Sequence, residues 1–90
     1  MNREIKKLEK YSADGYKYNC IKRVGSYAIF QQCTYTGYPV GYEVIVIQSN
    51  KQKEHAPTTE QWGTYGWSHT RLKNAEAKFL ELCRNGGAEV

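Results

Sequence analysis

The sequence predicts an α+β fold: a three-stranded antiparallel sheet with a C-terminal helix packed on one face and a short N-terminal helix before it. Three observations support this class. Apolar and polar residues alternate from residue 16, the turn signals "GS" and "TGYPVG" divide residues 16–49 into three strands, and an apolar stripe at helical spacing follows residue 69. A length of 90 residues suits one domain over 1–90.

Residues 1–15 are expected to form the N-terminal helical segment. Ile5 and Leu8 lie three apart among charged residues, which gives one or two helical turns a small apolar stripe. The turn signal "SADG" at 12–15 ends the segment. The first residues lack the apolar stretch of a signal peptide, and no apolar run approaches the roughly 20 residues that span a bilayer. We therefore expect a cytoplasmic protein with no membrane partner.

A β-meander is predicted over residues 16–49, and its first strand begins at residue 16. Alternation puts one set of side chains on one face, namely Tyr16, Tyr18, Cys20 and Val24. The opposite face then carries Lys17, Asn19 and Arg23, and Ile21 interrupts the pattern. A type II′ turn at "GS" sets Val24 opposite Tyr27, Cys20 opposite Gln31 and Tyr18 opposite Cys33.

The most β-like run of the chain is "YEVIVIQS" at 42–49. Its consecutive β-branched residues, from Val44 to Ile47, predict a strand that is covered on both faces or lies deep in the sheet. Residues 50–68 are predicted to be a loop, whose first part, 50–60, is polar, contains Pro57 and is expected to be exposed and mobile.

The C-terminal helix is predicted over residues 69–85. Its core stripe consists of Leu72, Ala75, Phe79, Leu82 and Cys83. Ser68 or Thr70 is expected to cap the helix, and "NGG" at 85–87 is expected to end it. Trp67 precedes the expected cap, where an apolar side chain packs back on the first turns, so we expect it to clamp the helix to the sheet.

Motifs for catalysis, metals and phosphate loops are absent from the sequence. His55 and His69 are fourteen residues apart, and the three cysteines contain no C-x-x-C pair, so they are expected to be packing residues. Ser68 and His69 are adjacent without a third triad residue, and Glu43 stands alone on its strand. The sequence therefore predicts a non-enzymatic protein without a cofactor or a metal.

Tyrosine content and charge placement are the features that bear on binding. The chain has eight tyrosines, and its whole net charge of +4 comes from residues 1–25, which hold seven Lys/Arg against three Asp/Glu. One hypothesis is a surface for a protein partner, formed by Trp62, Tyr65, Tyr35 and Tyr38. The alternative is a basic sheet face that binds nucleic acid directly through Lys17, Lys22, Arg23 and Tyr27. Two further alternatives stay open: the tyrosines fill a thin core, or an exposed strand edge mediates self-association.

The sequence also resembles small phage and prophage proteins of no assigned function. In these proteins a "YEV" strand leads through a polar loop to a "W-S/T-x-x-x-L-x-x-A" helix. The matching positions are Tyr42, Glu43 and Val44, then Trp67, Ser68, Leu72, Ala75 and Phe79. The resemblance implies a phage-type protein that docks on a host protein, or on a protein–nucleic-acid complex such as a nucleic-acid-guided defence nuclease, and inhibits or modulates it.

The predicted α-β-β-β-α order is similar to that of double-stranded-RNA-binding domains. The second helix of those domains begins with a lysine-rich run that grips phosphate. This chain offers only Arg71, Lys73 and Lys78 there, with Glu76 among them. That departure weighs against an RNA-binding role through the helix.

Overall fold

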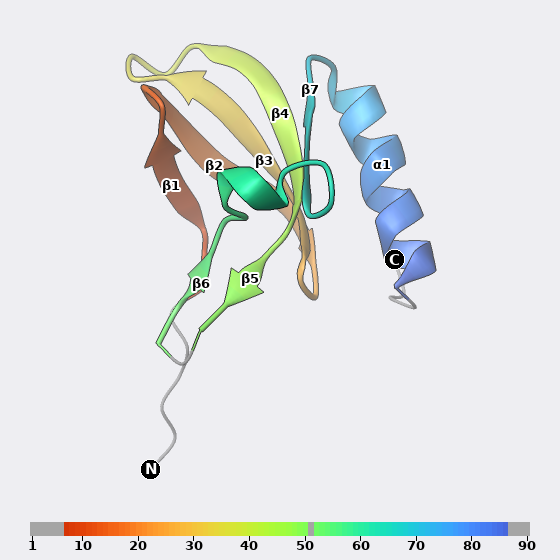
Figure 1. Ribbon diagram of the computed structural model, residues 1–90. Helices are drawn as coiled ribbons and strands as arrows, with labels where there is room; N and C mark the ends of the chain where they lie inside the picture. The colour runs from red at the N-terminus through yellow and green to blue at the C-terminus, as the bar shows by residue number, and fades with distance from the viewer. Residues whose placement is uncertain (1–6, 51, 87–90) are drawn as a thin grey trace.

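The computed structural model describes residues 7–50 and 52–86, and its main element is a five-stranded antiparallel sheet with one helix on one side (Figure 1). The strands lie across the sheet in the order β1 (Lys10–Ala13), β2 (Tyr16–Val24), β3 (Tyr27–Thr34), β4 (Pro39–Val46) and β7 (Gly66–His69). A separate two-stranded ribbon is made by β5 (Gln48–Ser49) and β6 (Glu54–His55). The short 3-10 helix η1 (Thr59–Gln61) and the helix α1 (Leu72–Asn85) complete the described chain.

One side of the sheet, which we call the helix face, packs against α1. The helix lies over β3, β4 and β7. Its buried side chains, Ala75, Phe79 and Cys83, form one core cluster with Ile29 of β3 and Val44 of β4. The apolar stripe predicted for the C-terminal helix therefore meets the sheet, except for Leu72 in the first turn, which is exposed.

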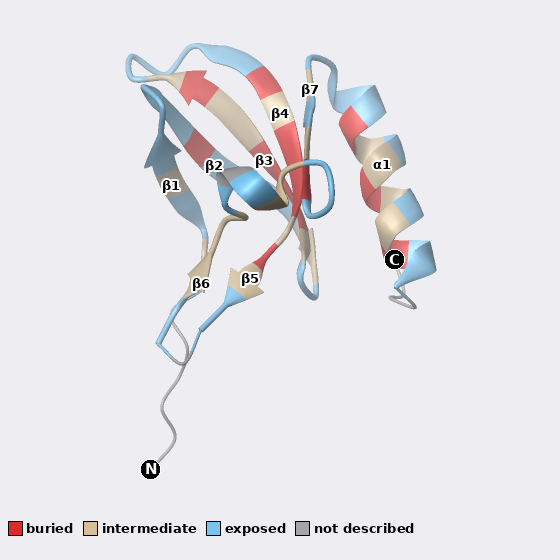
Figure 2. Cartoon of the chain, viewed as in Figure 1, coloured by how far each residue is buried: buried red, intermediate tan, exposed pale blue. Residues whose placement is uncertain are grey.

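The opposite side of the sheet, which we call the pocket face, has a second core cluster. It contains Tyr18, Ala28, Phe30, Ile45 and Ile47. Leu8, Tyr11, Ala56 and Trp62 pack against this cluster from the N-terminal segment and from the segment that follows β6. Figure 2 shows the buried stretch of β4 between the two layers. The expectation that this strand is covered on both faces is thus confirmed.

The prediction of an N-terminal helix and a three-stranded sheet is wrong. Residues 10–13 form the edge strand β1, which pairs with β2, and Tyr11 stacks on Tyr18 with ring centroids 4.6 Å apart. The backbone ladder and the stacked rings outweigh the weak helical signal of two apolar residues three apart. Ile5 lies outside the described residues. The α-β-β-β-α order that suggested a double-stranded-RNA-binding domain is therefore also not found in the described chain.

The predicted loop over 50–68 contains further regular structure. Asn50 N donates a backbone hydrogen bond to the Lys53 carbonyl at the tip of the β5–β6 ribbon, and Arg23 of β2 donates two hydrogen bonds to the Glu54 carboxylate of the ribbon. The strand β7 begins at Gly66 and pairs with β4, with Trp67 opposite Val44. A four-residue edge strand carries too little alternation to be recognised from the sequence.

A β-bulge in β2 changes the register that the sequence predicts. Val24 pairs with Tyr27 as expected, but the extra residue Ile21 shifts the earlier pairs, so Cys20 lies opposite Phe30 and Tyr18 opposite Gln32. An extra residue in a strand moves the side chains beyond it to the face opposite the one that regular alternation predicts. Arg23 therefore lies on the pocket face with Tyr18, and Val24 lies on the helix face.

The ends of α1 also differ from the predicted caps. The N-cap residue is Arg71, which makes no side-chain capping hydrogen bond, and Ser68 belongs to β7. The C-cap residue Gly86 has φ of −85°, so it ends the helix without the left-handed conformation. Trp67 lies on the helix face, where the Lys78 ammonium of α1 is 4.3 Å from its ring centroid. Within the described residues, no helix has the length and apolar character needed to cross a bilayer.

Candidate functional site

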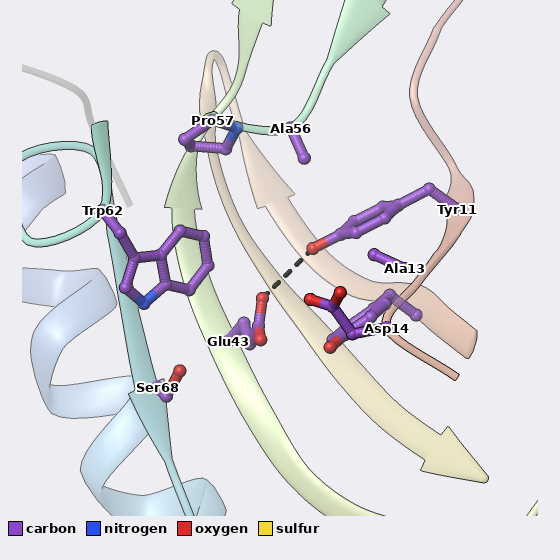
Figure 3. A pocket seen from close by; sticks show the side chains of 9 residues that line it. Tyr11, Ala13, Asp14, Glu43, Ala56, Pro57, Trp62 and Ser68 are labelled. Carbon is purple, nitrogen blue, oxygen red and sulfur yellow. Dashed lines mark hydrogen bonds between the residues drawn. The ribbon is translucent and has the colours of Figure 1, made fainter. Parts of the chain in front are cut away.

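The pocket face carries an open pocket of about 410 Å³ near the middle of β4 (Figure 3). This volume is at the lower end of the range of roughly 300–1,000 Å³ that is usual for ligand pockets. The pocket is formed where β1, β2, β4, β7 and the segment after β6 come together, and it is lined by Tyr11, Ala13, Asp14, Tyr18, Glu43, Ala56, Pro57, Trp62 and Ser68.

Glu43 lies at the centre of the pocket. Because β4 alternates, Glu43 points to the same side as the core residue Ile45, and only 8% of it is exposed. The Tyr11 hydroxyl donates a hydrogen bond of 3.2 Å to Oε2 of Glu43. Burial raises the pKa of the Glu43 carboxyl, since the charged form loses water, while the hydrogen bonds from Tyr11 and Tyr18 oppose this shift.

Aromatic rings form two walls of the pocket. Tyr11 stacks on Tyr18 with an interplanar angle of 10°, and Gln32 Nε2 donates to the Tyr18 hydroxyl at 3.0 Å. Burial and the charge of Glu43 raise the pKa of Tyr11 well above its ordinary value, so its phenol stays protonated as a donor. Figure 3 shows Trp62 on the other side of Glu43 from Tyr11.

The indole of Trp62 lies against the backbone of Gly66 in β7, where the lack of a side chain leaves room for it. A Cβ atom at Gly66 would lie 2.5 Å from Cε3 and 2.9 Å from Cδ2 of the indole. Ordinary contacts of a Cβ atom are longer than 3.0 Å. Only glycine at this position lets the ring approach the backbone of β7 this closely.

The charge of the pocket is opposite to that of the whole chain. Glu43 and Asp14 are the charged residues among those that line it, and the lining contains no lysine, arginine or histidine, although the chain carries +4. Asp14 occupies the turn between β1 and β2 with φ of 53°, and its charge raises the pKa of Glu43 further. The pocket is therefore an acidic site with aromatic walls.

Ser68 adds a hydroxyl to the lining, directly opposite Glu43 in the β4–β7 ladder, and no histidine lines the pocket beside them. Among the described residues, no group of three or more His, Cys, Asp or Glu side chains is placed to hold a metal ion. All three cysteines are free thiols, at Cys20, Cys33 and Cys83.

The four residues predicted to contact a protein partner lie at two ends of the sheet. Trp62 lines the pocket, and Tyr65 is 39% exposed near the end of β4, where its carbonyl accepts a hydrogen bond from Val46 N. Tyr35 and Tyr38 are 58% and 73% exposed in the turn before β4. Seven residues of extended strand separate these ends by about 23 Å. Of these four residues only Trp62 lines the pocket, and the structure does not bring them together into one surface.

The residues of the alternative nucleic-acid surface are divided between the two faces. Lys17 and Lys22 point to the helix face, where Lys17 lies 5.4 Å from the Tyr35 ring centroid and Lys22 5.4 Å from that of Phe79. Arg23 points to the pocket face and forms an ion pair of 2.6 Å with Glu54.

Tyr27, the fourth of these residues, is half-buried at the C-terminal end of α1, where its ring leaves no room for a Cβ atom at Gly86. The four residues therefore do not form one patch.

Sequence reasoning missed Tyr11, Asp14 and Glu43 as parts of a site. One signal was present. Glu43 and Ile45 are two apart in the most apolar strand, so a strand covered on both faces must bury this carboxylate. A buried carboxylate in such a strand requires partners or a function.

Comparisons of the chain with protein-family models, with curated proteins and with solved structures give no match. The function must therefore be inferred from the pocket and the surface.

Proposed function

We propose that the chain is a small, non-enzymatic binding protein that docks on a protein partner through its pocket face. The observation that carries the proposal is the open acidic pocket in which a buried carboxylate faces Trp62. A tryptophan beside a concave site is the usual anchor of a protein interface.

The cost of burying Glu43 supports a binding role for this face. A carboxylate with 8% exposure and a raised pKa opposes folding when it is ionised. An apolar residue would fill the position between Phe30 and β7 without that cost. A site that retains an unfavourable charge is typical of function at the expense of stability.

The phage-type origin and the cytoplasmic location belong to this proposal as expectations from the sequence. They make the partner a component of a bacterial host machine, such as a nucleic-acid-guided defence nuclease. Their support is the "YEV" strand and the helix pattern quoted above.

The test is to isolate a partner and map the face that it contacts. Affinity capture from a bacterial lysate would supply candidates, and each would be purified and recombined with the protein for size-exclusion chromatography. We expect a stoichiometric complex that Trp62→Ala weakens at least tenfold. Tyr38→Ala, at the distant turn, is the matched control and should leave the complex intact. A complex that survives Trp62→Ala would refute docking through the pocket face.

A second candidate function, direct binding of single-stranded nucleic acid, is supported by a different surface. Lys10 and Lys17 lie on the part of the helix face that α1 leaves uncovered, Lys22 lies at its border beside Phe79 of α1, and all three are exposed. We call this surface the lysine face. Among the described residues, no carboxylate lies within ion-pair distance of these lysines. Tyr35 beside Lys17 offers a ring for base stacking.

Salt dependence tests this candidate. Binding of labelled single-stranded DNA or RNA should weaken as salt rises, with a slope of log affinity against log salt of about −0.7 for each phosphate neutralised. Replacing Lys17 and Lys22 by glutamine should reduce that slope by about 1.4, whereas Lys73→Gln on the outer side of α1 should not change it. An unchanged slope in the double variant would exclude the lysine face as the binding surface.

A further inference from the structure

The composition of the pocket wall points to the class of ligand that it accepts. Two carboxylates, of Glu43 and Asp14, and no basic side chain line a pocket in a chain of net charge +4. An anionic group would be repelled. A neutral apolar ligand would cover Glu43 and leave its charge without water or a counter-ion, which is unfavourable.

Glu43 retains capacity to bind a donor. A carboxylate accepts about four hydrogen bonds, and the hydroxyls of Tyr11 and Tyr18 occupy two of these positions. Ser68, exposed at the edge of β7, adds a hydroxyl oxygen to the same wall. Several acceptors therefore converge on a space that a group with two or three N–H donors could fill.

The remaining walls suit a cation that carries an apolar stem. The indole of Trp62 lies across the pocket from Tyr11, and aromatic faces attract ammonium and guanidinium groups. Ala56 and Pro57 supply apolar surface at the rim. A volume of about 410 Å³ exceeds what a bare ion needs.

We infer that the pocket binds an organic cation, the ammonium or guanidinium end of a basic side chain, between the Glu43 carboxylate and the Trp62 indole. This inference rests on the proposed function, in which the side chain belongs to a lysine or arginine of the docked protein partner. Asp14 provides a second negative charge at the mouth, and Tyr11 orients the Glu43 carboxylate for the incoming donor.

The test is an NMR titration of the ¹⁵N-labelled chain with small probes. The cationic probes are n-butylammonium and n-butylguanidinium, and n-butanol is the neutral control. Peptides of the form acetyl-Gly-X-Gly-amide carry Lys, Arg or the neutral norleucine at X. We expect saturable shifts of the Trp62 indole N–H and of the Glu43 and Ser68 amides with the cationic probes. Binding of the neutral probes should be at least tenfold weaker. Equal binding of n-butanol and n-butylammonium would overturn the inference.

The two kinds of probe distinguish the sources of the cation. Tighter binding of the Lys or Arg peptide than of the matching free amine supports a protein side chain. Binding of the free compounds alone would overturn the assignment to a protein side chain and make a small free amine the ligand.

Variants separate a ligand role of Glu43 from a structural one. Glu43→Gln keeps an acceptor oxygen for Tyr11, so the variant should unfold at a urea concentration no lower than the wild type while cation affinity falls at least tenfold. Glu81→Gln removes the same charge from the outer side of α1 and should change neither quantity. Wild-type affinity in Glu43→Gln would refute the inference.

Asp14→Asn decides the question if Glu43→Gln does not fold. Asparagine tolerates the positive φ of this turn, so the fold should be kept, and affinity for the cationic probes should fall about threefold. Unchanged affinity in this variant would contradict a cation site lined by both carboxylates.

The inference and the proposed function fail in different ways. If no cationic probe binds but the partner complex is still lost in Trp62→Ala, the inference fails and the docking face stands. If the probes bind in a Glu43-dependent way but no partner complex depends on Trp62, the cation site stands and the proposed function fails.

Discussion

Replacing Gly66 by alanine tests whether the backbone of β7 positions Trp62 in the pocket wall. The added Cβ would lie 2.5 Å from Cε3 and 2.9 Å from Cδ2 of the indole. Ordinary van der Waals contact begins at 3.4 Å, so the ring must move by roughly 1 Å or turn away from the strand. We expect the variant to fold with a displaced Trp62 and a deformed pocket.

The energetic cost follows from the packing that the indole would lose. Trp62 lies against the cluster of buried residues on the pocket face, and forcing extra atoms into such packing costs about 1–3 kcal/mol. A domain of this length has a free energy of unfolding of about 5–13 kcal/mol, so the variant should remain folded. The loss should lower the melting temperature by about 4–8 °C for each kcal/mol.

Gly63→Ala is the matched control in the same loop. A Cβ atom at Gly63 would have nothing within 4 Å, but φ is 90°, so alanine there costs a comparable 1–3 kcal/mol, roughly, through backbone strain alone. Thermal unfolding should therefore show two similarly destabilised proteins. The indole N–H resonance of Trp62, assigned with Trp67→Phe, should move in Gly66→Ala and stay in Gly63→Ala. An unmoved Trp62 resonance in Gly66→Ala would refute the close contact.

Four other changes test separate parts of the structure. The hydrogen bonds from Arg23 lower the pKa of Glu54 to about 2. Their contribution to the free energy of unfolding is therefore complete above the unfolded-state pKa of about 4.3 and is lost as pH falls from there to about 2. Over this window the free energy of unfolding in urea should depend less on pH in Glu54→Gln than in the wild type, and an equal pH dependence would contradict the ion pair. Phe79→Ala removes a fully buried ring and should cost about 3–5 kcal/mol by the same assay, so a loss below about 1 kcal/mol would mean that α1 is not seated on the sheet as described. Tyr11→Phe deletes a donor to Glu43 and should raise the pKa of that carboxyl, measured by its ¹³C titration; a lower pKa would show that the bond is absent. Deleting the bulge residue Ile21 should leave the folded spectrum largely intact, because the pairs on both sides of it keep their faces, and loss of folding would show that the bulge is required.

The sequence predicted the elements whose periodicity is long and strong. The C-terminal helix, the turn between β2 and β3 and the doubly covered strand β4 each follow from several residues in one pattern. The edge strands β1 and β7 are four residues each, which is too short for alternation to be distinguished from a loop. Their structure depends on partners distant in the sequence, such as Tyr18 for Tyr11 and Val44 for Trp67.

The pocket could be predicted only in part, because it too depends on contacts between residues that are distant in the sequence. Trp62 was predicted as a partner contact because, unlike Trp67 beside the helix, it had no structural role to fill. Tyr11 and Glu43 are 32 positions apart in the chain, and they meet only because β1 adds to the sheet as a fifth strand. A prediction that assigned residues 1–15 to a helix could not bring Tyr11 to the pocket face.

The bulge at Ile21 explains how the chain separates its charges. Perfect alternation would have put Lys17 and Arg23 on one basic face, as the sequence predicted. The extra residue reverses which face each later side chain of β2 occupies, so Arg23 lies on the pocket face. There it forms an ion pair with Glu54, which holds the β5–β6 ribbon against β2. The lysines remain on the opposite side. The bulge thus exchanges two cations between the faces: Lys22 joins the lysine face, and Arg23 lies on the pocket face, where Glu54 neutralises it.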